Sequence, residues 1–355
     1  SASIPAIDSR ITLILSILIG GITLTGSLIA FAKLQELMSG SPITYPLQQP
    51  INIALFVGFI IGSGYFITAP KDEIAFLILT AVSLILGVLF VLPIGGADMP
   101  VVISLLNSFS GIAASAAGFV LMNNILIIAG ALVGASGIIL TQIMCKGMNR
   151  TLSSVLFGAF GGAKAQTGGA GGTIETRTAK TVDSEECAMM LAYARSVVII
   201  PGYGMAVAQA QHGVRELADR LELLGVDVKY AIHPVAGRMP GHMNVLLAEA
   251  NVPYPQLYDM DDINPQFDRT DVALVIGAND VVNPAARSDR NSPIYGMPIL
   301  EVDKAKHTIV IKRGMSQGFA GVENELFFQD NTMMLFGNAK DAIGKLISDI
   351  KQLSS

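Results

Sequence analysis

Long apolar stretches, separated by short polar connections, fill residues 1–145. Five of these stretches reach the roughly 20 apolar residues that a helix needs to cross a bilayer. They run over about Ile11–Ala32, Ile51–Ala69, Ile74–Leu92, Met99–Met122 and Asn124–Met144. The connections after the second and the fourth stretch are very short, so these neighbours must form antiparallel hairpins. The pattern therefore predicts an all-α transmembrane helical bundle.

Beyond about residue 180, short β-branched runs alternate with segments that suit helices. Helices are predicted at 185–195, 205–224, 242–250 and 339–353. Strands are predicted at 197–200, 226–232, 256–259, 272–276, 298–302 and 307–312, with 256–259 the weakest. This alternation is typical of an α/β domain with a doubly wound parallel sheet covered on both faces.

The stretch between these two patterns, residues 147–180, is rich in Gly, Ala, Thr and Ser and has no core-forming period. Such a composition predicts a flexible Gly-rich linker. We therefore divide the chain into a transmembrane domain at 1–146, this linker, and a nucleotide-binding domain at 181–355. The sequence opens at Ser1 without a Met, and we expect a fragment or a processed chain.

The composition agrees with a chain that lies partly in lipid. Hydrophobic residues make up 51% of it and charged residues only 14%, whereas soluble domains carry roughly 25% charged residues. The net charge of −5 offers no footprint for nucleic acid. Two cysteines, Cys145 and Cys187, are too few for a disulfide framework, and we expect no metal site.

The few charges near the spans suggest an orientation. An odd number of spans places the two ends of the bundle on opposite sides of the membrane. Lys33, Lys146 and Arg150 lie on the side of the C-terminal half, whereas Arg10 and Lys71 lie on the far side. This slight Lys/Arg bias favours a cytoplasmic or matrix-side C-terminal domain.

A Gly-x-Gly-x-x-Ala sequence, Gly202–Ala208, directly follows the β-branched run 197–200 and leads into a helical segment. In a Rossmann-like domain the first Gly makes the tight turn, and the second lets the backbone approach a pyrophosphate at the helix N-terminus. Taken alone, the motif is a weak signal, and an ordinary glycine turn explains it about as well.

Other candidate loops also follow predicted strands, where open α/β sheets bind ligands. His233–Gly241 lacks the acid that usually holds the ribose 2′-hydroxyl of NAD, and the adjacent cations Lys312 and Arg313 could clamp a 2′-phosphate. Together these features favour NADP. Lys312 and Arg313 could equally be a solvated strand end, while His233 and Asp280 could be turn residues.

Two polar residues stand out in the fourth span. Asn107 lies well inside it and needs a partner, and Asp98 lies at its mouth. Polar groups inside a membrane often mark ion or proton paths. Asp98 could instead cap the helix, with Pro100 in the first turn. The glycines Gly130, Gly134 and Gly137 of the fifth span allow close helix packing.

Several of these motifs together resemble the beta subunit of proton-translocating nicotinamide nucleotide transhydrogenases, without its first few spans. The resemblance is carried by Pro201–Gln211, His233–Pro240, Gly277–Asn283, Gly95–Pro100, Asn107 and the glycines of the fifth span. It implies hydride transfer between NAD(H) and NADP(H), coupled to proton translocation. It also implies that this chain binds NADP(H).

The partners and location that the resemblance implies follow from the same family. NAD(H) is bound by an alpha subunit or domain I, further membrane helices complete the membrane part in lipid, and the assembly is a homodimer. The membrane is a bacterial or mitochondrial inner membrane, and the NADP(H) domain faces the cytoplasm or matrix.

The resemblance implies catalytic roles for Asp280, as a buried acid that senses proton and redox state, and for His233. Asp98 and Asn107 match positions of the proton path, and Asn283–Pro298 would form a lid over the nucleotide. Cofactor contacts are implied for Gly202, Tyr203, Gly204, Met205, Ala206, Val207, His233, Pro234, Val235, Ala236, Gly237, Arg238, Gly277, Ala278, Asn279, Asp280, Asn283, Lys312, Arg313 and Gly314.

The sequence also departs from the family pattern. No histidine precedes His212, although the family has one in an earlier span, and Asn124 and Phe319 stand where an acid and a Tyr are common. Two other functions stay open: a membrane-tethered NADP(H) sensor without catalysis, and a transporter with a regulatory nucleotide domain. The small number of spans and the lack of an inverted repeat argue against a transporter.

Overall fold

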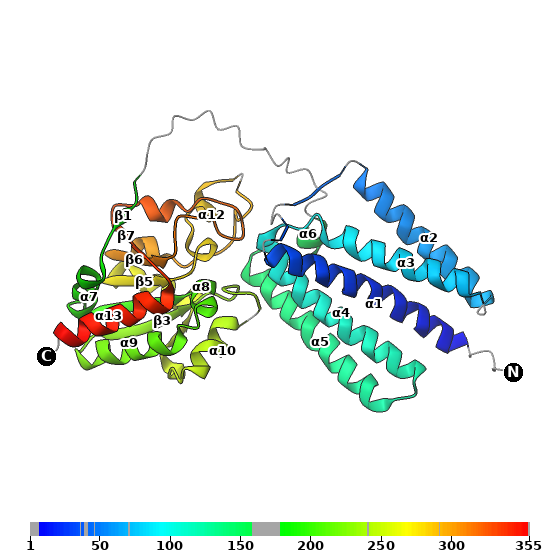
Figure 1. The fold of residues 1–355 in the computed structure, drawn as a ribbon, viewed down its shortest axis with the longest axis horizontal. Coiled ribbons are helices and arrows are strands. Elements are labelled where there is room, and N and C mark those ends of the chain that lie inside the picture. The colour runs from blue at the N-terminus through cyan, green and yellow to red at the C-terminus, as the bar shows by residue number, and fades with distance from the viewer. Residues whose placement is uncertain are drawn as a thin grey trace. The chain divides into compact units, whose positions relative to one another are not determined.

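The computed structural model describes residues 7–35, 37–38, 42–45, 47–69, 72–157, 178–239, 241–290 and 292–353. These residues form two compact units, the first built from helices and the second around a sheet (Figure 1). The central part of the predicted linker, 158–177, lies outside the described residues, as do Pro240 and Asn291.

The described part of the first unit contains five helices that are long and apolar enough to cross a membrane. They are α1 (Ile7–Leu34), α2 (Gln48–Thr68), α3 (Glu73–Val91), α4 (Met99–Val120) and α5 (Asn124–Gly147). Two short elements accompany them, the 3-10 helix η1 (Gly96–Asp98) and α6 (Leu152–Phe157). The five predicted spans are thus confirmed, with ends shifted by a few residues.

Helices α4 and α5 pack with their backbones in near contact. A Cβ atom on Gly111 of α4 would lie 2.5 Å from the Gly134 nitrogen and 2.8 Å from the Gly130 oxygen of α5. The Ser108 hydroxyl donates to the Gly134 carbonyl at 2.6 Å. In lipid, van der Waals packing and such interhelical hydrogen bonds hold helices together. The small residues therefore explain how this hairpin closes.

The second unit is organised around one parallel sheet, whose order within the described residues is β1-β7-β6-β5-β2-β3-β4. Its strands are β1 (Lys180–Thr181), β2 (Ser196–Pro201), β3 (Asp227–Ile232), β4 (Leu257–Asp259), β5 (Val272–Ile276), β6 (His307–Lys312) and β7 (Thr332–Phe336). The chain builds β2, β3 and β4 outward in one direction and then returns to place β5 on the other side of β2. This reversal is the topological switch point of a Rossmann-like sheet.

Helices and 3-10 turns cover both faces of this sheet (Figure 1). The α-helices are α7 (Ser184–Ala192), α8 (Tyr203–Val207), α9 (Gln211–Leu223), α10 (His242–Glu249), α11 (Met260–Ile263), α12 (Ala285–Ser288) and α13 (Ala339–Leu353). The 3-10 helices are η3 (Tyr254–Gln256), η4 (Asn264–Arg269), η5 (Asp280–Val282), η6 (Val302–Lys304) and η7 (Glu325–Phe328).

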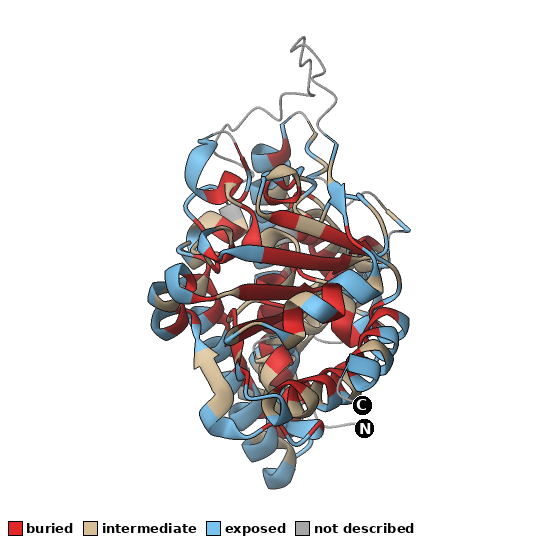
Figure 2. Ribbon diagram, turned by 90° about the vertical axis from the view of Figure 1, so that its left-hand side faces the viewer, coloured by how far each residue is buried: buried red, intermediate tan, exposed pale blue. Residues whose placement is uncertain are grey.

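Strand β2 shows how the sheet separates two cores. Val197 and Ile199 pack with α7, α9 and α13 on one face, whereas Val198 and Ile200 pack with α11 and the 3-10 turns on the other. Because alternate residues of a strand point to opposite faces, a run of four apolar residues buries both faces. The inner strands are accordingly buried along their length (Figure 2). The predicted doubly wound parallel sheet is confirmed.

Three details of the predicted elements are wrong. The segment 298–302 is not a strand, because its backbone bonds with loops: the Leu300 N–H donates to Val281 and the Glu301 N–H to the Asn264 side chain. Strand β7 occupies 332–336, where none was predicted. The predicted helix 205–224 is two helices, because Gln209 adopts a left-handed backbone with φ 52°.

Replacing Gly111 with Ala should destabilise the membrane unit by about 1–3 kcal/mol, because the added methyl group overpacks two backbones. The matched control is Gly64→Ala, where a Cβ meets nothing within 4 Å. The measurement is the thermal midpoint of each variant in detergent. Equal midpoints for the two variants would contradict the packing described for α4 and α5.

Candidate functional site

Four loops meet the carboxyl edge of the sheet around the switch point between β2 and β5. They follow β2, β3, β5 and β6, and they carry every C-terminal residue that the sequence singled out. The described site is built from Gly202–Ala208, His233–Met239, Gly277–Asn283 and Lys312–Gly321.

The loops after β2 and β5 touch through bare backbone. A Cβ on Gly204 would lie 2.7 Å from the Gly277 Cα, and one on Gly202 would lie 2.4 Å from the Ala278 nitrogen. Two hydrogen bonds of 2.9 Å join them, from the Gly202 N–H to Ile276 and from the Gly204 N–H to Gly277. Gly277 has φ +64°, a conformation that side chains rarely adopt. The glycines thus hold the two loops together.

Asp280 lies in this junction with its carboxyl group buried. Its Oδ2 atom accepts a hydrogen bond from the Ala320 N–H at 3.0 Å, whereas its buried Oδ1 atom has no hydrogen-bond partner among the described residues. Burial raises the pKa of Asp280, and the Ala320 N–H and the positive charge of Lys312 lower it in part. This carboxyl group is therefore easier to protonate than an exposed one.

Lys312 turns toward the same junction. Its ammonium donates to the Ser316 carbonyl and lies 5.0 Å from the centre of the Phe327 ring. Burial lowers the pKa of Lys312, and the charge of Asp280 acts in the opposite direction. Arg313, in contrast, is exposed. The predicted pair of cations is therefore adjacent, but its two members face different surroundings.

Both charged groups hold one loop. Lys312 binds the loop after β6 at Ser316, and Asp280 binds it at Ala320. Between these points, a Cβ on Gly318 would lie 2.4 Å from Asp280 Oδ1, so only glycine fits there without a shift. The sequence signalled this loop only by the strand before it.

Arg238 completes the rim with a stack of aromatic rings. Its guanidinium carbon lies 4.4 Å from the Tyr203 ring centre and 5.9 Å from that of Phe319. The two rings lie 5.6 Å apart, centre to centre. Sequence reasoning singled out all three residues but did not predict their contact. The stack joins the loops after β2, β3 and β6, and it leaves Arg238 at the same edge as Lys312.

His233 is buried at the end of β3 with both ring nitrogens engaged. Its Nδ1 atom accepts from the Val235 N–H at 3.2 Å, so Nε2 carries the proton and donates to the Pro298 carbonyl at 2.8 Å. Burial lowers the pKa of His233 to about 4. Both contacts position loops, and the catalytic role implied for this residue stays a prediction.

Amide side chains tie the loop after β5 to residues 323–324. Asn324 donates to the backbone and side-chain oxygens of Asn279, both at 3.0 Å, and the buried Asn283 donates to the Glu323 carbonyl at 3.1 Å. The buried Asn279 amide nitrogen has no partner within the described residues. Together with the unpaired Asp280 Oδ1 atom, it offers a donor and an acceptor to a polar ligand. The junction therefore fits a nucleotide.

The other predicted contact residues are divided between core and surface. Met205, Ala206, Ala236 and Ala278 are buried, whereas Val207 is exposed. Those with intermediate exposure are Pro234, Val235, Gly237 and Gly314.

In the membrane unit, Asp98 forms an ion pair with Arg150, with 3.4 Å between Oδ1 and Nη1. The buried Lys33 ammonium donates to the Leu92 and Ile94 carbonyls at 2.6 and 2.7 Å, and so fixes the loop that leads to Asp98. Asn107 lies two and a half turns further along α4 and is exposed. The two predicted proton-path residues thus lie on α4 and at its N-terminal end.

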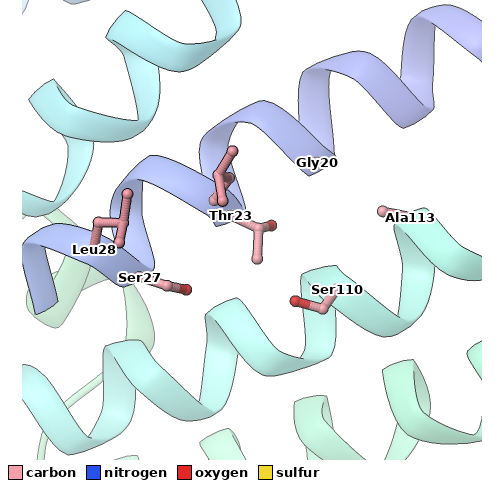
Figure 3. Close-up of a pocket in the computed structure, with 7 residues that line it drawn as sticks. Gly20, Thr23, Ser27, Leu28, Ser110 and Ala113 are labelled. Carbon is pink, nitrogen blue, oxygen red and sulfur yellow. The ribbon is translucent and has the colours of Figure 1, made fainter. Parts of the chain in front are cut away.

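A pocket of about 490 Å³ opens between α1 and α4 (Figure 3). It is lined by Gly20, Thr23, Leu24, Ser27, Leu28, Ser110 and Ala113. The Thr23 and Ser110 hydroxyls donate within their own helices, to Ile19 at 2.6 Å and to Leu106 at 3.1 Å. Asn107 precedes Ser110 by three residues, the spacing of one helix face. Small and polar side chains thus gather on this face of α4.

Fold and site together define a membrane protein with a Rossmann-like domain whose carboxyl edge carries a buried acid and adjacent cations. Residues 2–349 match the family described as NAD(P) transhydrogenase beta subunit. Two curated relatives from Rhodospirillum rubrum, each called NAD(P) transhydrogenase subunit beta, are 55% identical over 341 residues, which is 96% of this chain and 73% of theirs. The chain belongs to the NAD(P) transhydrogenase beta subunit family.

Membership has direct consequences. The family is part of the proton-translocating NAD(P)⁺ transhydrogenase, so the chain is a subunit of an enzyme that uses NADP(H) and NAD(H), with an alpha subunit as partner. The candidate spans fit a membrane protein.

The pKa of His233 leads to a test of its protonation state. With a folded pKa of about 4 and an unfolded value of roughly 6.5, the unfolded chain binds more protons between these pH values. Stability is therefore lost as the pH falls from 6.5 toward 4, by about 2 kcal/mol between pH 7 and pH 5. Histidine NMR should show a neutral ring protonated at Nε2 at pH 6.

A matched comparison isolates this contribution. His233→Asn should be less stable than wild type at pH 7 but should lose less of its remaining stability at pH 5. A charged His233 ring at pH 6, or the same pH dependence in both proteins, would contradict the arrangement.

Proposed function

We propose that residues 181–355 bind NADP(H) at the carboxyl edge of the sheet. A hydride then passes between it and NAD(H) on the alpha subunit, coupled to proton translocation through the membrane. The observation that carries this proposal is the buried Asp280 carboxyl group, which has one unpaired oxygen and shares a loop with Lys312. Family membership supports the chemistry, and this geometry supports the location.

The residues of the chain bind and orient the nucleotide in this proposal. Lys312 and Arg313 hold the 2′-phosphate, the Gly202–Ala208 turn lies against the pyrophosphate, and Arg238 lines the adjoining loop. Bound NADPH supplies the hydride, so the protein contributes position, charge and exclusion of water. The 2′-phosphate draws Lys312 away from the Ser316 carbonyl.

Asp280 is the group through which protonation affects binding. Its raised pKa follows from burial, and the nearby Lys312 charge stabilises the ionised form. When a nucleotide changes the surroundings of this carboxyl group, its proton affinity changes, and by linkage the pH changes nucleotide affinity to the same extent. Such a coupled equilibrium is what a proton-driven exchange of NADP(H) requires.

The membrane unit supplies part of the proton path in this proposal. Asp98 with Arg150 lies at one end of α4, and Asn107 lies on its exposed side. Further helices of the enzyme cover this side and bring the histidine that these spans lack. The assembly is a homodimer in a bacterial or mitochondrial inner membrane, with residues 181–355 on the cytoplasmic or matrix side and 147–180 as linker.

The function is tested with the chain assembled in vesicles with its alpha subunit and the complete set of membrane helices. We expect NADPH to reduce an NAD analogue while protons move across the membrane, and Asp280→Asn to bind NADPH with an affinity that no longer varies with pH. NADPH binding without hydride exchange would support a sensor. An unchanged pH dependence in Asp280→Asn would exclude the role given to this residue.

The choice of nucleotide provides a separate prediction. Lys312→Met should weaken NADPH binding by about 10- to 100-fold, because a charge-assisted hydrogen bond contributes roughly 1.5–3 kcal/mol, and should leave NADH binding unchanged. Lys345→Met, which removes an exposed charge of α13, is the control. Fluorescence titration with both nucleotides measures the effect, and an equal loss for NADH would refute a 2′-phosphate contact.

A further inference from the structure

The segment that follows η5 folds back on itself around a core of its own. Ala285, Ala286, Ile294, Met297 and Ile299 are each at most 7% exposed and pack together, separately from the two cores of the sheet. The Gly296 N–H donates to the Ala286 carbonyl at 2.9 Å and closes this small structure internally. Segment 284–299 is therefore a preformed unit, described except at Asn291.

This unit lies against the site loops. Its core packs on Val235 from the loop after β3 and on Ala320 and Val322 from the loop after β6. Ala320 is also the residue whose N–H binds Asp280. A nucleotide that enters between these loops must therefore displace the unit or pass beneath it.

Two neutral contacts fix the ends of the unit. Asn283 binds the Glu323 carbonyl at one end, and His233 binds the Pro298 carbonyl at the other. Both side chains are buried. These contacts leave Pro284 and Pro298 as the points at which the unit joins the rest of the domain.

A cluster of four charges closes the base of the unit. Arg287 of α12 forms ion pairs with Glu301, at 3.1 Å, and with Asp303, and Lys304 binds Glu301 at 2.5 Å. The Asp303 and Glu301 side chains are only 19% and 25% exposed. A planar guanidinium that contacts two carboxylates is more strongly constrained than a single exposed ion pair.

The acidic side of this cluster is itself held rigidly. The Glu301 N–H binds the Asn264 side chain, whose amide in turn donates to the Ile299 carbonyl at 3.0 Å. Asn331 donates to the Asp303 carbonyl at 3.1 Å. Because the carboxylates are fixed to the sheet side, Arg287 is the part of the cluster that moves with the unit.

We propose that Arg287 is a positioning residue that clamps segment 284–299 over the site through Glu301 and Asp303 and thereby sets the rate of NADP(H) release. The clamp rests on the proposed nucleotide site but contacts no group assigned to nucleotide binding. Opening the unit breaks two ion pairs at its base, while its own core stays intact. Release is therefore governed by a rigid unit rather than by a disordered loop.

The test measures NADPH release by stopped-flow fluorescence, with excess NADP⁺ as chase, in the assembled transhydrogenase. Arg287→Met should release NADPH about three- to tenfold faster, the range that corresponds to roughly 0.7–1.4 kcal/mol. Arg287→Lys should lie between the variant and wild type. The control Lys351→Met removes the same charge from the Lys351–Glu216 pair, which joins α13 to α9, and should leave release unchanged.

A double-mutant cycle separates the clamp from a general loss of stability. Asp303→Asn should accelerate release, and the double variant Arg287→Met/Asp303→Asn should be slower than the product of the two effects predicts, because the partners act together. Independent effects, or release as slow as in Lys351→Met, would overturn the clamp alone. Wild-type protein that binds no NADPH would overturn the proposed nucleotide site as well.

Discussion

The contact between the backbones of Gly204 and Gly277 is the constraint on which the carboxyl edge depends. The loops after β2 and β5 leave neighbouring strands and meet where the sheet reverses its order. Since no side chain fits between them, the two loops are fixed relative to each other, and Asp280 follows three residues later. The buried carboxyl group thus owes its position to two residues without side chains, and its surroundings follow from that junction.

Much of the architecture could be predicted because burial leaves a periodic signal. Apolar stretches of spanning length predicted five membrane helices, and β-branched runs predicted β2, β3, β5 and β6. Strand β7 was missed because its Thr-Met-Met-Leu-Phe sequence follows Asn331 and lacks β-branched residues after Thr332. The segment 298–302 was mistaken for a strand because an apolar run buried against loops has the same composition as one buried in a sheet.

The candidate site could be located but not assembled from the sequence. Strand ends identified the loops that carry His233, Asp280 and Lys312, since ligands bind at this edge of parallel sheets. The partners of these residues were not predictable, because Pro298, Ser316 and Ala320 lie in loops without a repeating pattern. His233 shows the consequence. Its sequence context allowed a catalytic or a turn residue, whereas its two hydrogen bonds show a residue that connects loops.

Lys312 is subject to two demands that cannot both be met in full. Its charge stabilises the ionised form of Asp280, which burial disfavours. In the proposed function the same ammonium binds the 2′-phosphate, and a dianion beside it offsets the charge that Asp280 experiences. Binding of the phosphate then favours the protonated carboxyl group, and protonation in turn releases Lys312 for the phosphate. Because one cation lies between two acids, nucleotide occupancy and proton affinity are linked without any movement of the sheet.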